Sequence, residues 1–385
     1  MGGRLEMTVA DGFRELFERR RRARDDSPDL LEGREGVVLA GAGTVGRQFL
    51  DALRSAKVPV FAFADNGPDK WGARIGGVPV MAPSEAVPRF GRQAVHVLTI
   101  GRIGKEIAAV REQYSVLGAD RILHFIEAIP RLPEIWPRFF LDPEAFREDD
   151  GHQCAGAFEL LSDDESRQHF QAHLAWRAAL DPSQLAIPTY DDQYFPAGVI
   201  EPRHCASFID IGAYTGDTLG TLVRFAGPSL RRYDGFEPDP GNFARLKDAA
   251  SAYRPSAAIE IHRIAVGASS GTTCFDGNGS ATSRLDVHGD TSVRCARLDD
   301  LRLGRPTYIK IDVEGGEDDV LRGADRTLAA AQPVVAIATY HRPRDLFELP
   351  LRLSRYAADY RFYLRSHGDA GIDLVCYAVR AVEAA

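Results

Sequence analysis

The feature that most constrains the fold is an alternation of short apolar runs with stretches of helical periodicity, which occurs twice along the chain. The first series begins at Gly36 and the second at Ala206. Such alternation is typical of parallel sheets whose strands are joined by crossover helices. The sequence therefore predicts an α/β fold in which two different doubly wound sheets follow one another.

The positions of the apolar runs predict the strands and the division of the chain. Residues 130–202, between the two series, are rich in proline, aromatic and acidic residues, and 155–180 read as a helical stretch. We therefore expect an N-terminal helical arm at 1–35, an α/β domain at 36–128, a helical connector at 129–202 and a second α/β domain at 203–385. A helix is expected at 104–114, and the strands are expected at 37–40, 58–63, 78–81, 95–100, 121–125, 208–211, 233–236, 259–262, 308–311, 334–337, 360–363 and 374–379.

Charge and composition exclude several classes of protein. The formal net charge is −8 and basic residues are interspersed with acids, so the positive surface that nucleic-acid binding requires is missing. The run Arg19–Arg22 lies beside acidic residues and is interpreted as a solvated helix face. The five cysteines are widely spaced, which fits neither a disulfide framework nor a structural zinc site. The cysteine pattern therefore predicts a reducing cytoplasm. Because no apolar stretch has the form of a signal peptide or is long enough to span a membrane, we expect the protein to start near Met1.

A glycine-rich loop, GAGTVG at 41–46, follows the first predicted strand and opens a predicted helix. In this pattern the glycines allow backbone amides to approach a phosphate, and Asp65 stands where an acid takes the ribose hydroxyls of a dinucleotide. Either the loop binds a nucleotide, or its glycines only make a tight turn. The residues assigned to a nucleotide site are Gly41, Gly43, Thr44, Val45, Gly46, Asp65 and Asn66.

The sequence after this loop resembles a known domain. Residues 64–72 read ADNGPDKWG and residues 75–80 read IGGVPV. This stretch is similar to the nucleotide-sugar-binding N-terminal domain of bacterial sugar acyltransferases and related polysaccharide-biosynthesis proteins. The resemblance implies a sugar nucleotide or another nucleotide as the ligand, rather than NAD(H).

A second glycine loop, in FIDIGAYTGDT at 208–218, is flanked by acids rather than by phosphate-binding groups. Gly212 and Gly216 remove side chains where a ligand would lie against the backbone, and Asp210 stands at the carboxyl end of its strand. An acid there suits a positively charged ligand such as S-adenosylmethionine. Glu237, at the end of the next predicted strand, is placed to accept hydrogen bonds from both ribose hydroxyls.

These motifs resemble those of a methyltransferase family. Residues 210–217 and 236–239 are similar to motifs of class I S-adenosylmethionine-dependent methyltransferases, and YIKIDVEGGE at 308–317, followed by VLRGA at 320–324, resembles the FkbM-type signature. The resemblance implies two Rossmann-like domains, the second with a seven-stranded sheet whose last strand is antiparallel, and O-methylation of sugar or natural-product hydroxyls. The cofactor residues that it implies are Asp210, Gly212, Ala213, Tyr214, Gly216, Asp217, Thr218, Glu237, Pro238, Ala265, Val266 and Asp312.

The reaction requires a group that takes the proton of the attacking hydroxyl, and a histidine is the usual acceptor. His341 and His367 follow the fifth and sixth strands of the second series, at the edge that carries the cofactor loops. We expect His341 to be the general base, with His367 as the alternative. For each, the competing interpretation is a loop histidine bonded to the backbone.

Charged residues after the fourth strand of this series have two interpretations. Asp312 and Glu314 are expected to line the methyl-transfer cleft, with Lys310 balancing their charge, because several charges at a strand end are costly unless they are used or paired. Glu317 is interpreted as part of a solvated acidic cluster at a helix start.

A metal-dependent variant, in which one Mg²⁺ ion orients two sugar hydroxyls, is left open but is not favoured, because carboxylates suit a hard ion and histidine suits it less well. Its ligands would be Asp312, Glu314, His341 and His367. We expect the Gly/Ser-rich loop at 276–284 to fold over the cofactor or the acceptor. A charged substrate would explain Arg284, Arg342 and Arg365, although surface arginines are the ordinary case.

The sequence thus predicts an S-adenosylmethionine-dependent O-methyltransferase that acts on a hydroxyl of a sugar, sugar nucleotide, glycan or related natural product. A nucleotide in the first domain and a homodimer are further expectations, whereas nucleic acid and a membrane span are not expected. One alternative is an NAD(P)-dependent oxidoreductase that uses the loop at 41–46. Another is a non-catalytic sugar-nucleotide-binding protein.

Overall fold

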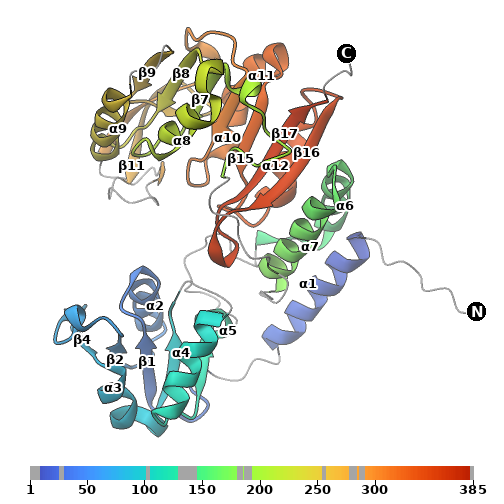
Figure 1. Ribbon diagram of the computed structural model, residues 1–385. Helices are drawn as coiled ribbons and strands as arrows, with labels where there is room; N and C mark the ends of the chain where they lie inside the picture. The colour runs from blue at the N-terminus through green and yellow to red at the C-terminus, as the bar shows by residue number, and fades with distance from the viewer. Residues whose placement is uncertain are drawn as a thin grey trace, which may run out of the picture. The chain divides into compact units, whose positions relative to one another are not determined.

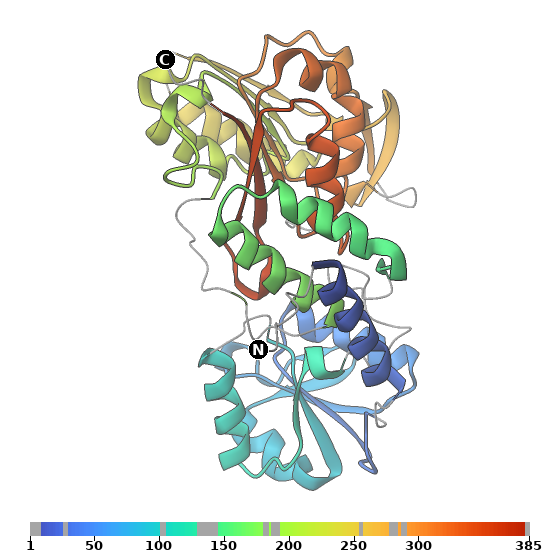
Figure 2. The same cartoon turned by 90° about the vertical axis from the view of Figure 1, so that its right-hand side faces the viewer.

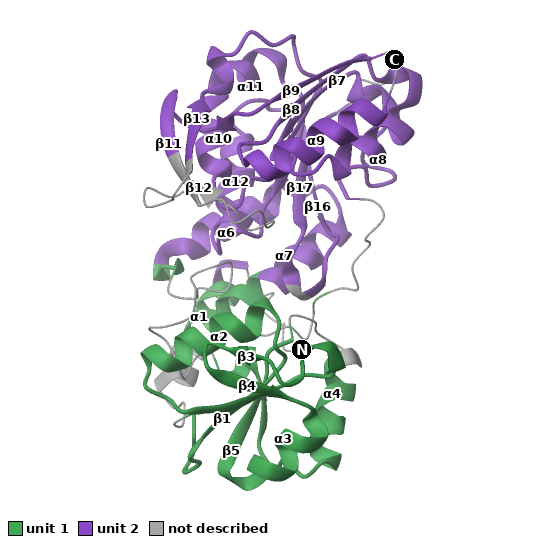
Figure 3. Cartoon of the chain, turned by 90° about the vertical axis from the view of Figure 1, so that its left-hand side faces the viewer, with its two compact units in different colours: residues 1–7, 11–148, 174–185 green, residues 8–10, 149–173, 186–385 purple. Residues whose placement is uncertain are grey.

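The structure, a computed structural model, divides the chain into two compact units that interleave along the sequence (Figure 3). Unit 1 comprises residues 1–7, 11–148 and 174–185, and unit 2 comprises residues 8–10, 149–173 and 186–385. No helix among the described residues is long and apolar enough to cross a membrane. The described residues are 9–25, 30–100, 105–128, 145–179, 185, 193–253, 257–276, 284–285 and 291–381.

Unit 1 is built on a six-stranded sheet of order β3-β4-β2-β1-β5-β6 (Figure 1). The strands from β4 to β6 run parallel, whereas β3 is antiparallel to β4. An order that grows in both directions from β1 is that of a doubly wound sheet. The elements are β1 (Gly36–Ala40), α2 (Thr44–Ser55), β2 (Val60–Ala64), β3 (Arg74–Ile75), β4 (Val78–Met81), α3 (Pro83–Phe90), β5 (Ala94–Leu98), α4 (Lys105–Val116), β6 (Ile122–His124) and α5 (Phe125–Ala128).

Both faces of the unit 1 sheet are covered, which explains why its strands read as continuous apolar runs. Val37 and Leu39 of β1 pack in the cluster that contains α2. Val38 and Ala40 pack in the cluster that contains α3 and α4. Successive side chains of a strand point to opposite faces, so a strand that is covered on both faces requires an apolar residue at each of these positions. The predicted strands of the first series and the helix at 104–114 are confirmed within a few residues.

Unit 2 is built on a seven-stranded sheet of order β16-β17-β15-β14-β7-β8-β9. Strands β9, β8, β7, β14 and β15 are parallel neighbours, and β17 is inserted antiparallel between β15 and β16. The expected seven-stranded sheet with an antiparallel last strand is therefore confirmed. The strands are β7 (Ser207–Ile211), β8 (Arg232–Phe236), β9 (Ala258–His262), β14 (Tyr308–Ile311), β15 (Val334–Ala338), β16 (Tyr360–Ser366) and β17 (Leu374–Arg380).

Helices cover this sheet, and its parallel strands end at one common edge. Phe208, Tyr233, Tyr308 and Tyr377, from four strands, pack with α8 in one buried cluster. The chain turns from the carboxyl end of each parallel strand into a loop, so the ends of β7, β8, β14 and β15 share one edge. The helices are α8 (Asp217–Ala226), α9 (Pro240–Ala252), α10 (Glu317–Gly323), α11 (Asp325–Ala331) and α12 (Asp345–Leu353).

Unit 2 also contains a four-stranded sheet that the sequence analysis missed, of order β10-β13-β11-β12. Its longest strands read GTTCFD and TSVRCA, so polar residues interrupt the apolar pattern by which we located the other strands. Residues 277–283 of the expected Gly/Ser-rich loop lie outside the described residues. The strands are β10 (Ala265–Val266), β11 (Gly271–Asp276), β12 (Arg284–Leu285) and β13 (Thr291–Ala296).

The helical stretch expected at 155–180 is in fact two helices, α6 (Gly151–Leu160) and α7 (Asp164–Ala179). Between them Leu161 forms a parallel bridge with Phe362 of β16, and the Ser162 amide donates to the Phe362 carbonyl over 2.9 Å. These bonds satisfy backbone groups that an edge strand would otherwise leave open. Figure 2 shows α6 and the first half of α7 beside the hairpin of β16 and β17.

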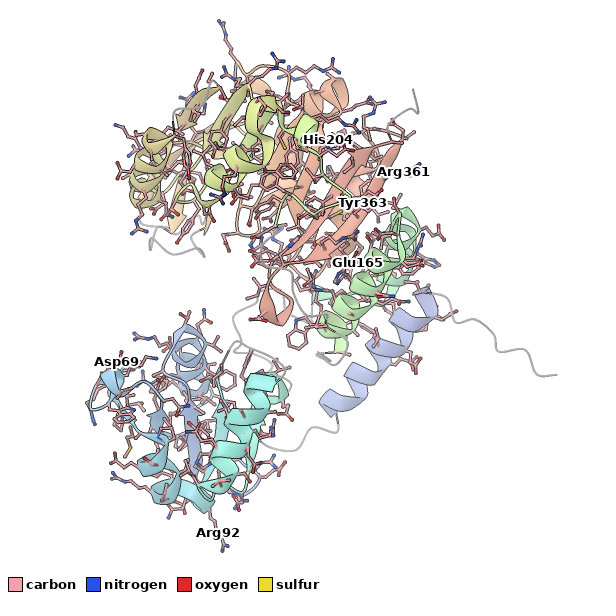
Figure 4. The ribbon with its side chains drawn as sticks, viewed as in Figure 1. Asp69, Arg92, Glu165, His204, Arg361 and Tyr363 are labelled. Carbon is pink, nitrogen blue, oxygen red and sulfur yellow. The ribbon has the colours of Figure 1, made fainter. Side chains whose placement is uncertain are left out.

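Side chains of α7 strengthen this contact with β16. Asp163 caps the helix by accepting a hydrogen bond from the Ser166 amide over 2.8 Å. Arg365 of β16 donates to Asp163 over 2.7 Å and lies 3.3 Å from Glu165, which is labelled in Figure 4. Residues 149–173 therefore belong to unit 2 rather than to a separate connector. Arg365 is engaged in this contact, which argues against its predicted role as a substrate-binding arginine.

The expected N-terminal arm contains one helix, α1 (Val9–Asp25). Phe13 is fully buried, and its ring lies 5.9 Å from that of Phe146. This helix therefore has a packed apolar face in addition to its charged residues. The side chains of Arg19–Arg22 lie outside the described ones.

Candidate active site

A pocket opens at the carboxyl edge of the unit 2 sheet, where the strand order reverses between β7 and β14. Open α/β sheets bind their ligands at such a point. Ten of the residues assigned to the cofactor or to catalysis line it, but their roles there stay predictions. The pocket is lined by Gln193, Tyr194, Ile211, Gly212, Tyr214, Asp217, Thr218, Phe236, Glu237, Pro238, Asn242, Ile264, Ala265, Val266, Lys310, Asp312, Val313, Glu314, Gly316, Tyr340 and Asp373.

The two glycines of the loop after β7 are required by neighbouring protein atoms. Gly212 has a φ of +82°, and a Cβ there would lie 1.8 Å from the Asp312 carbonyl oxygen. Gly216 has a φ of +85°, and a Cβ there would lie 2.9 Å from that of Ala249. Both glycines were predicted to allow a ligand to approach the backbone, and that role stays a prediction. The structure shows that they let β14 and α9 come close to the loop.

Asp210 does not line the pocket, which corrects its predicted role as a direct cofactor contact. Its side chain is fully buried between Lys310, 3.1 Å away, and the Tyr233 hydroxyl, which donates to it over 2.9 Å. Burial would lower the pKa of Lys310, but Asp210 and Asp312 raise it above its ordinary value. Lys310 also donates to the Gly212 carbonyl over 2.6 Å. The pair therefore fixes the glycine loop, and Lys310 chiefly balances Asp210 rather than Asp312 and Glu314.

Glu237 faces the pocket as predicted, and backbone amides hold it there. One carboxylate oxygen accepts from the Tyr214 amide over 3.0 Å and the other from the Asp239 amide over 2.9 Å. Burial raises the pKa of Glu237 to about 7, although these two hydrogen bonds act in the opposite direction. The carboxylate is thus oriented before any ligand arrives.

At the other end of the pocket, Asp312 and Glu314 converge on His341. The His341 Nε2 atom lies 3.5 Å from Asp312 Oδ1 and 3.4 Å from Glu314 Oε2. Its Nδ1 atom lies 2.8 Å from Glu317 Oε1. Glu317 is only 1% exposed, so it is not the solvated helix-start acid that the sequence analysis described. Burial raises the pKa of Glu314, and His341 only partly offsets this.

His341 lies outside the pocket lining and has carboxylates beside both ring nitrogens, which argues against its predicted role as the general base. Burial would lower the pKa of His341, but Glu317, Glu314 and Asp312 raise it well above its ordinary value. A protonated imidazole has no lone pair with which to accept another proton. Asp312 and Glu314, which line the pocket, are better placed for that role.

His367, the alternative base, is also not in the pocket lining. It is buried, and its Nε2 atom lies 2.8 Å from the Tyr377 hydroxyl. Of the four residues considered for a metal ion, the structure brings together Asp312, Glu314 and His341 and leaves His367 out of the group. His367 is therefore a structural residue of the β16–β17 hairpin.

Tyr194 is a pocket residue that sequence reasoning missed. Its hydroxyl donates to Asp312 Oδ2 over 2.6 Å, and Lys310 Nζ lies 5.2 Å from its ring. Its backbone amide donates to the Tyr377 hydroxyl over 3.1 Å, and its carbonyl accepts from the Tyr308 hydroxyl. Burial and Asp312 raise its pKa well above the ordinary value, so it stays a donor. No motif marks this residue, because it precedes β7 in an irregular segment.

In unit 1, the loop between β1 and α2 uses Asp65 for its own structure. The Asp65 carboxylate accepts from the amides of Ala42, over 2.7 Å, and Gly67, over 2.8 Å, and pairs with Lys70 over 3.1 Å. It is therefore already engaged, which argues against its predicted role as a ribose ligand. A Cβ at Gly46 would lie 2.0 Å from the Gly41 carbonyl oxygen, so tight packing accounts for that glycine. Nucleotide binding by this loop stays a prediction.

Comparison with known families identifies the C-terminal region. Residues 210–369 match the family model described as the methyltransferase FkbM domain. The chain therefore carries a methyltransferase FkbM domain. The matched region begins at Asp210 in β7 and ends between β16 and β17, so it includes the pocket-lining residues apart from Gln193, Tyr194 and Asp373.

A curated protein and a solved structure are similar to this chain. The hexuronic acid methyltransferase AglP of Haloferax volcanii is 28% identical over 142 residues, which are 35% of this chain and 58% of that protein. The crystal structure of the methyltransferase FkbM from Methylobacillus flagellatus KT matches with a TM-score of 0.77 and 21% identity. That match covers 96% of this chain and 97% of the other, so the likeness in fold extends beyond the FkbM domain.

Proposed function

We propose that this protein is an S-adenosylmethionine-dependent O-methyltransferase that methylates a hydroxyl of a sugar, sugar nucleotide, glycan or related natural product. The main support for this proposal is the negative charge of the pocket lining. Five carboxyl side chains line it, and Lys310 is the only lysine or arginine among its described lining residues. This charge suits a cofactor with a sulfonium and an ammonium group, since opposite charges attract strongly in a partly desolvated site.

The two ends of the pocket suggest how the reactants lie. Glu237, held by two backbone amides, takes the ribose hydroxyls of the cofactor. Asp312 and Glu314, at the end of β14, face the acceptor. The hydroxyl oxygen forms a bond to the methyl carbon, the electrons of the C–S bond remain on sulfur, and the proton passes to a carboxylate of this pair. The products are a methyl ether and S-adenosylhomocysteine, and the rate depends mainly on positioning.

The acidic acceptor end favours a hydroxyl over a carboxylate as the attacking group. Asp312, Glu314 and Asp373 all line the pocket, and a carboxylate acceptor would be repelled by them. The similar AglP protein is named for hexuronic acid, a sugar derivative, which supports an acceptor of the sugar class. We expect the enzyme to act in a reducing compartment such as the cytoplasm. The four free cysteines that the structure describes, Cys154, Cys205, Cys295 and Cys376, are compatible with this.

The alternatives have less support. An NAD(P)-dependent oxidoreductase would use the loop at 41–46, but Asp65 is engaged within that loop and the acidic pocket would have no role. A non-catalytic sugar-nucleotide-binding protein would not need a preorganised Glu237 in unit 2.

The acceptor class can be tested with methyl-labelled S-adenosylmethionine and a panel of glycosides, sugar nucleotides and uronic acids. We expect label in a product that resists mild alkali, as a methyl ether does. Label that mild alkali releases as methanol would identify a methyl ester and contradict the proposed acceptor class.

A further inference from the structure

We propose that Asp312, Glu314 and His341 hold a divalent cation, Mg²⁺ or Mn²⁺, at the acceptor end of the pocket. Cation binding itself is independent of the proposed function, whereas the role given to the cation below rests on it. One carboxylate oxygen from each acid and one ring nitrogen of His341 all lie within 4.8 Å of one another.

The distances between these atoms are close to those of ligands around one ion. His341 Nε2 lies 3.5 Å from Asp312 Oδ1 and 3.4 Å from Glu314 Oε2. Ligands at adjacent corners of an octahedron are about 3 Å apart when each bond to the ion is about 2.1 Å. Small side-chain movements would therefore bring the three atoms to coordinating distance.

Glu317 orients the histidine as in many metal sites. Its Oε1 atom lies 2.8 Å from His341 Nδ1, and the same oxygen accepts from the Val313 amide over 3.0 Å. A histidine that binds a metal commonly donates its other N–H to a carboxylate, which fixes the ring and the tautomer. Here this arrangement directs Nε2 toward Asp312 and Glu314.

The charges around the site also favour a cation. Within the part of the chain that the structure describes, no lysine or arginine nitrogen lies within 4.0 Å of the Asp312 or Glu314 carboxylate. Lys310, the nearby cation, is paired with Asp210. Partly buried carboxylates that share one site repel one another unless a positive group lies among them. A divalent ion between Asp312 and Glu314 would supply such a charge.

A second cluster of possible metal ligands in unit 2 differs from this site in its charge balance. Asp234, Glu260 and His262 also bring possible ligand atoms within 4.8 Å of one another. Arg232, however, lies 2.6 Å from Asp234 and 3.1 Å from Glu260, so an arginine already balances these acids. This cluster needs no ion, and it provides a matched control.

A cation at this site would restrict the kinds of acceptor that the pocket can bind. Three protein ligands leave coordination positions that face the pocket, and Mg²⁺ and Mn²⁺ prefer oxygen ligands there. Two neighbouring hydroxyls of a sugar ring fit these positions, and the bound oxygen would lose its proton more easily to the Glu314 carboxylate oxygen that does not bind the ion. We therefore infer an acceptor with a vicinal diol.

The site can be tested with Mn²⁺ as the probe, by electron paramagnetic resonance on the full chain after treatment with a chelator. We expect one Mn²⁺ per chain, with affinity reduced at least about tenfold in Glu314→Gln and in Asp312→Asn, and unchanged in Glu260→Gln. Mg²⁺ should compete with the bound Mn²⁺. Circular dichroism of each variant verifies that it is folded.

Titration with S-adenosylmethionine in parallel separates this inference from the proposed function. Binding of S-adenosylmethionine without binding of Mn²⁺ would overturn the cation site alone. The same would follow if folded Glu314→Gln and Asp312→Asn both kept the affinity of the unaltered chain for Mn²⁺. Binding of Mn²⁺ without S-adenosylmethionine would support the site and contradict the methyltransferase proposal.

Discussion

At the scale of single residues, position along the strands predicted which acids line the pocket, but not which acids are buried in pairs. Glu237, Asp312 and Glu314 follow strand ends and face the pocket. Asp210 lies near the carboxyl end of β7, yet it is buried against Lys310, and Glu317 is buried against His341. These partners are far apart in the sequence, so only the packing of the strands reveals them.

The pKa of Glu237 predicts how cofactor affinity depends on pH. Burial raises this pKa to about 7, so the carboxylate is ionised above pH 7 and protonated below it. If the ionised form binds the positively charged cofactor, the dissociation constant for S-adenosylmethionine should rise about tenfold from pH 8 to pH 6. Isothermal titration across this range measures it. The Glu237→Gln variant should lack this dependence, and a full pH response in the variant would exclude Glu237 as its cause.

Tyr194 should act as a positioning residue for Asp312. The Tyr194→Phe change removes the hydroxyl that donates to Asp312 over 2.6 Å. We expect the methyl-transfer rate constant kcat to fall about tenfold, because a hydrogen bond to a charged group contributes about 1.5 kcal/mol, with less than about twofold change in S-adenosylmethionine affinity.

Steady-state kinetics and a binding titration together test this expectation for Tyr194. Tyr363→Phe, on β16 and outside the pocket lining, is the matched control and should change neither quantity. An equal loss of rate and affinity in Tyr194→Phe would indicate a general disturbance of the pocket instead.

At the scale of elements, the strands that are buried on both faces were predicted almost completely, because such strands need apolar side chains at nearly every position. The strands β11 and β13 were missed, since they alternate threonine, serine and arginine with apolar residues. The break between α6 and α7 was also missed. Leu161 is apolar and continues the helical pattern, but it pairs with β16 instead.

The glycine turn after β7 can be tested with a matched pair of substitutions. Gly212 and Gly198 both have positive φ, +82° and +76°, but a Cβ at Gly212 would lie 1.8 Å from a backbone oxygen, whereas one at Gly198 would meet nothing within 4 Å. Gly198→Ala should lower the free energy of unfolding by about 1–2 kcal/mol. Gly212→Ala should lower it by more than about 3 kcal/mol, because β14 must also move. Equal effects in urea unfolding would show that the close approach of β14 is unimportant.

At the scale of the whole molecule, the two sheets were predicted in the right order, but the sequence did not reveal that the units interleave. Residues 149–173 belong to unit 2 and residues 174–185 to unit 1, although both fall in the predicted connector. The composition of this segment predicted an irregular connector, and only its pairing with β16 assigns its first part to unit 2.

This assignment predicts how truncated chains behave. A fragment of residues 203–385 lacks the segment that pairs with β16 and also lacks Tyr194, so it exposes an edge strand. Residues 149–385 should unfold at a higher temperature and remain monodisperse, whereas residues 203–385 should aggregate. Thermal unfolding and size-exclusion chromatography test this. The same melting temperature for both fragments would contradict the assignment.

The most direct test of the central claim is isothermal titration of the full chain with S-adenosylmethionine, S-adenosylhomocysteine and NADH. We expect micromolar binding of the first two, and affinity at least about tenfold weaker in Glu237→Ala, since hydrogen bonds to a charged group are lost. Glu348→Ala, an exposed carboxylate on α12 that pairs with Arg344, should bind as the unaltered chain does. Tight binding of NADH with no binding of S-adenosylmethionine or S-adenosylhomocysteine would contradict the account and move the active site to the loop at 41–46.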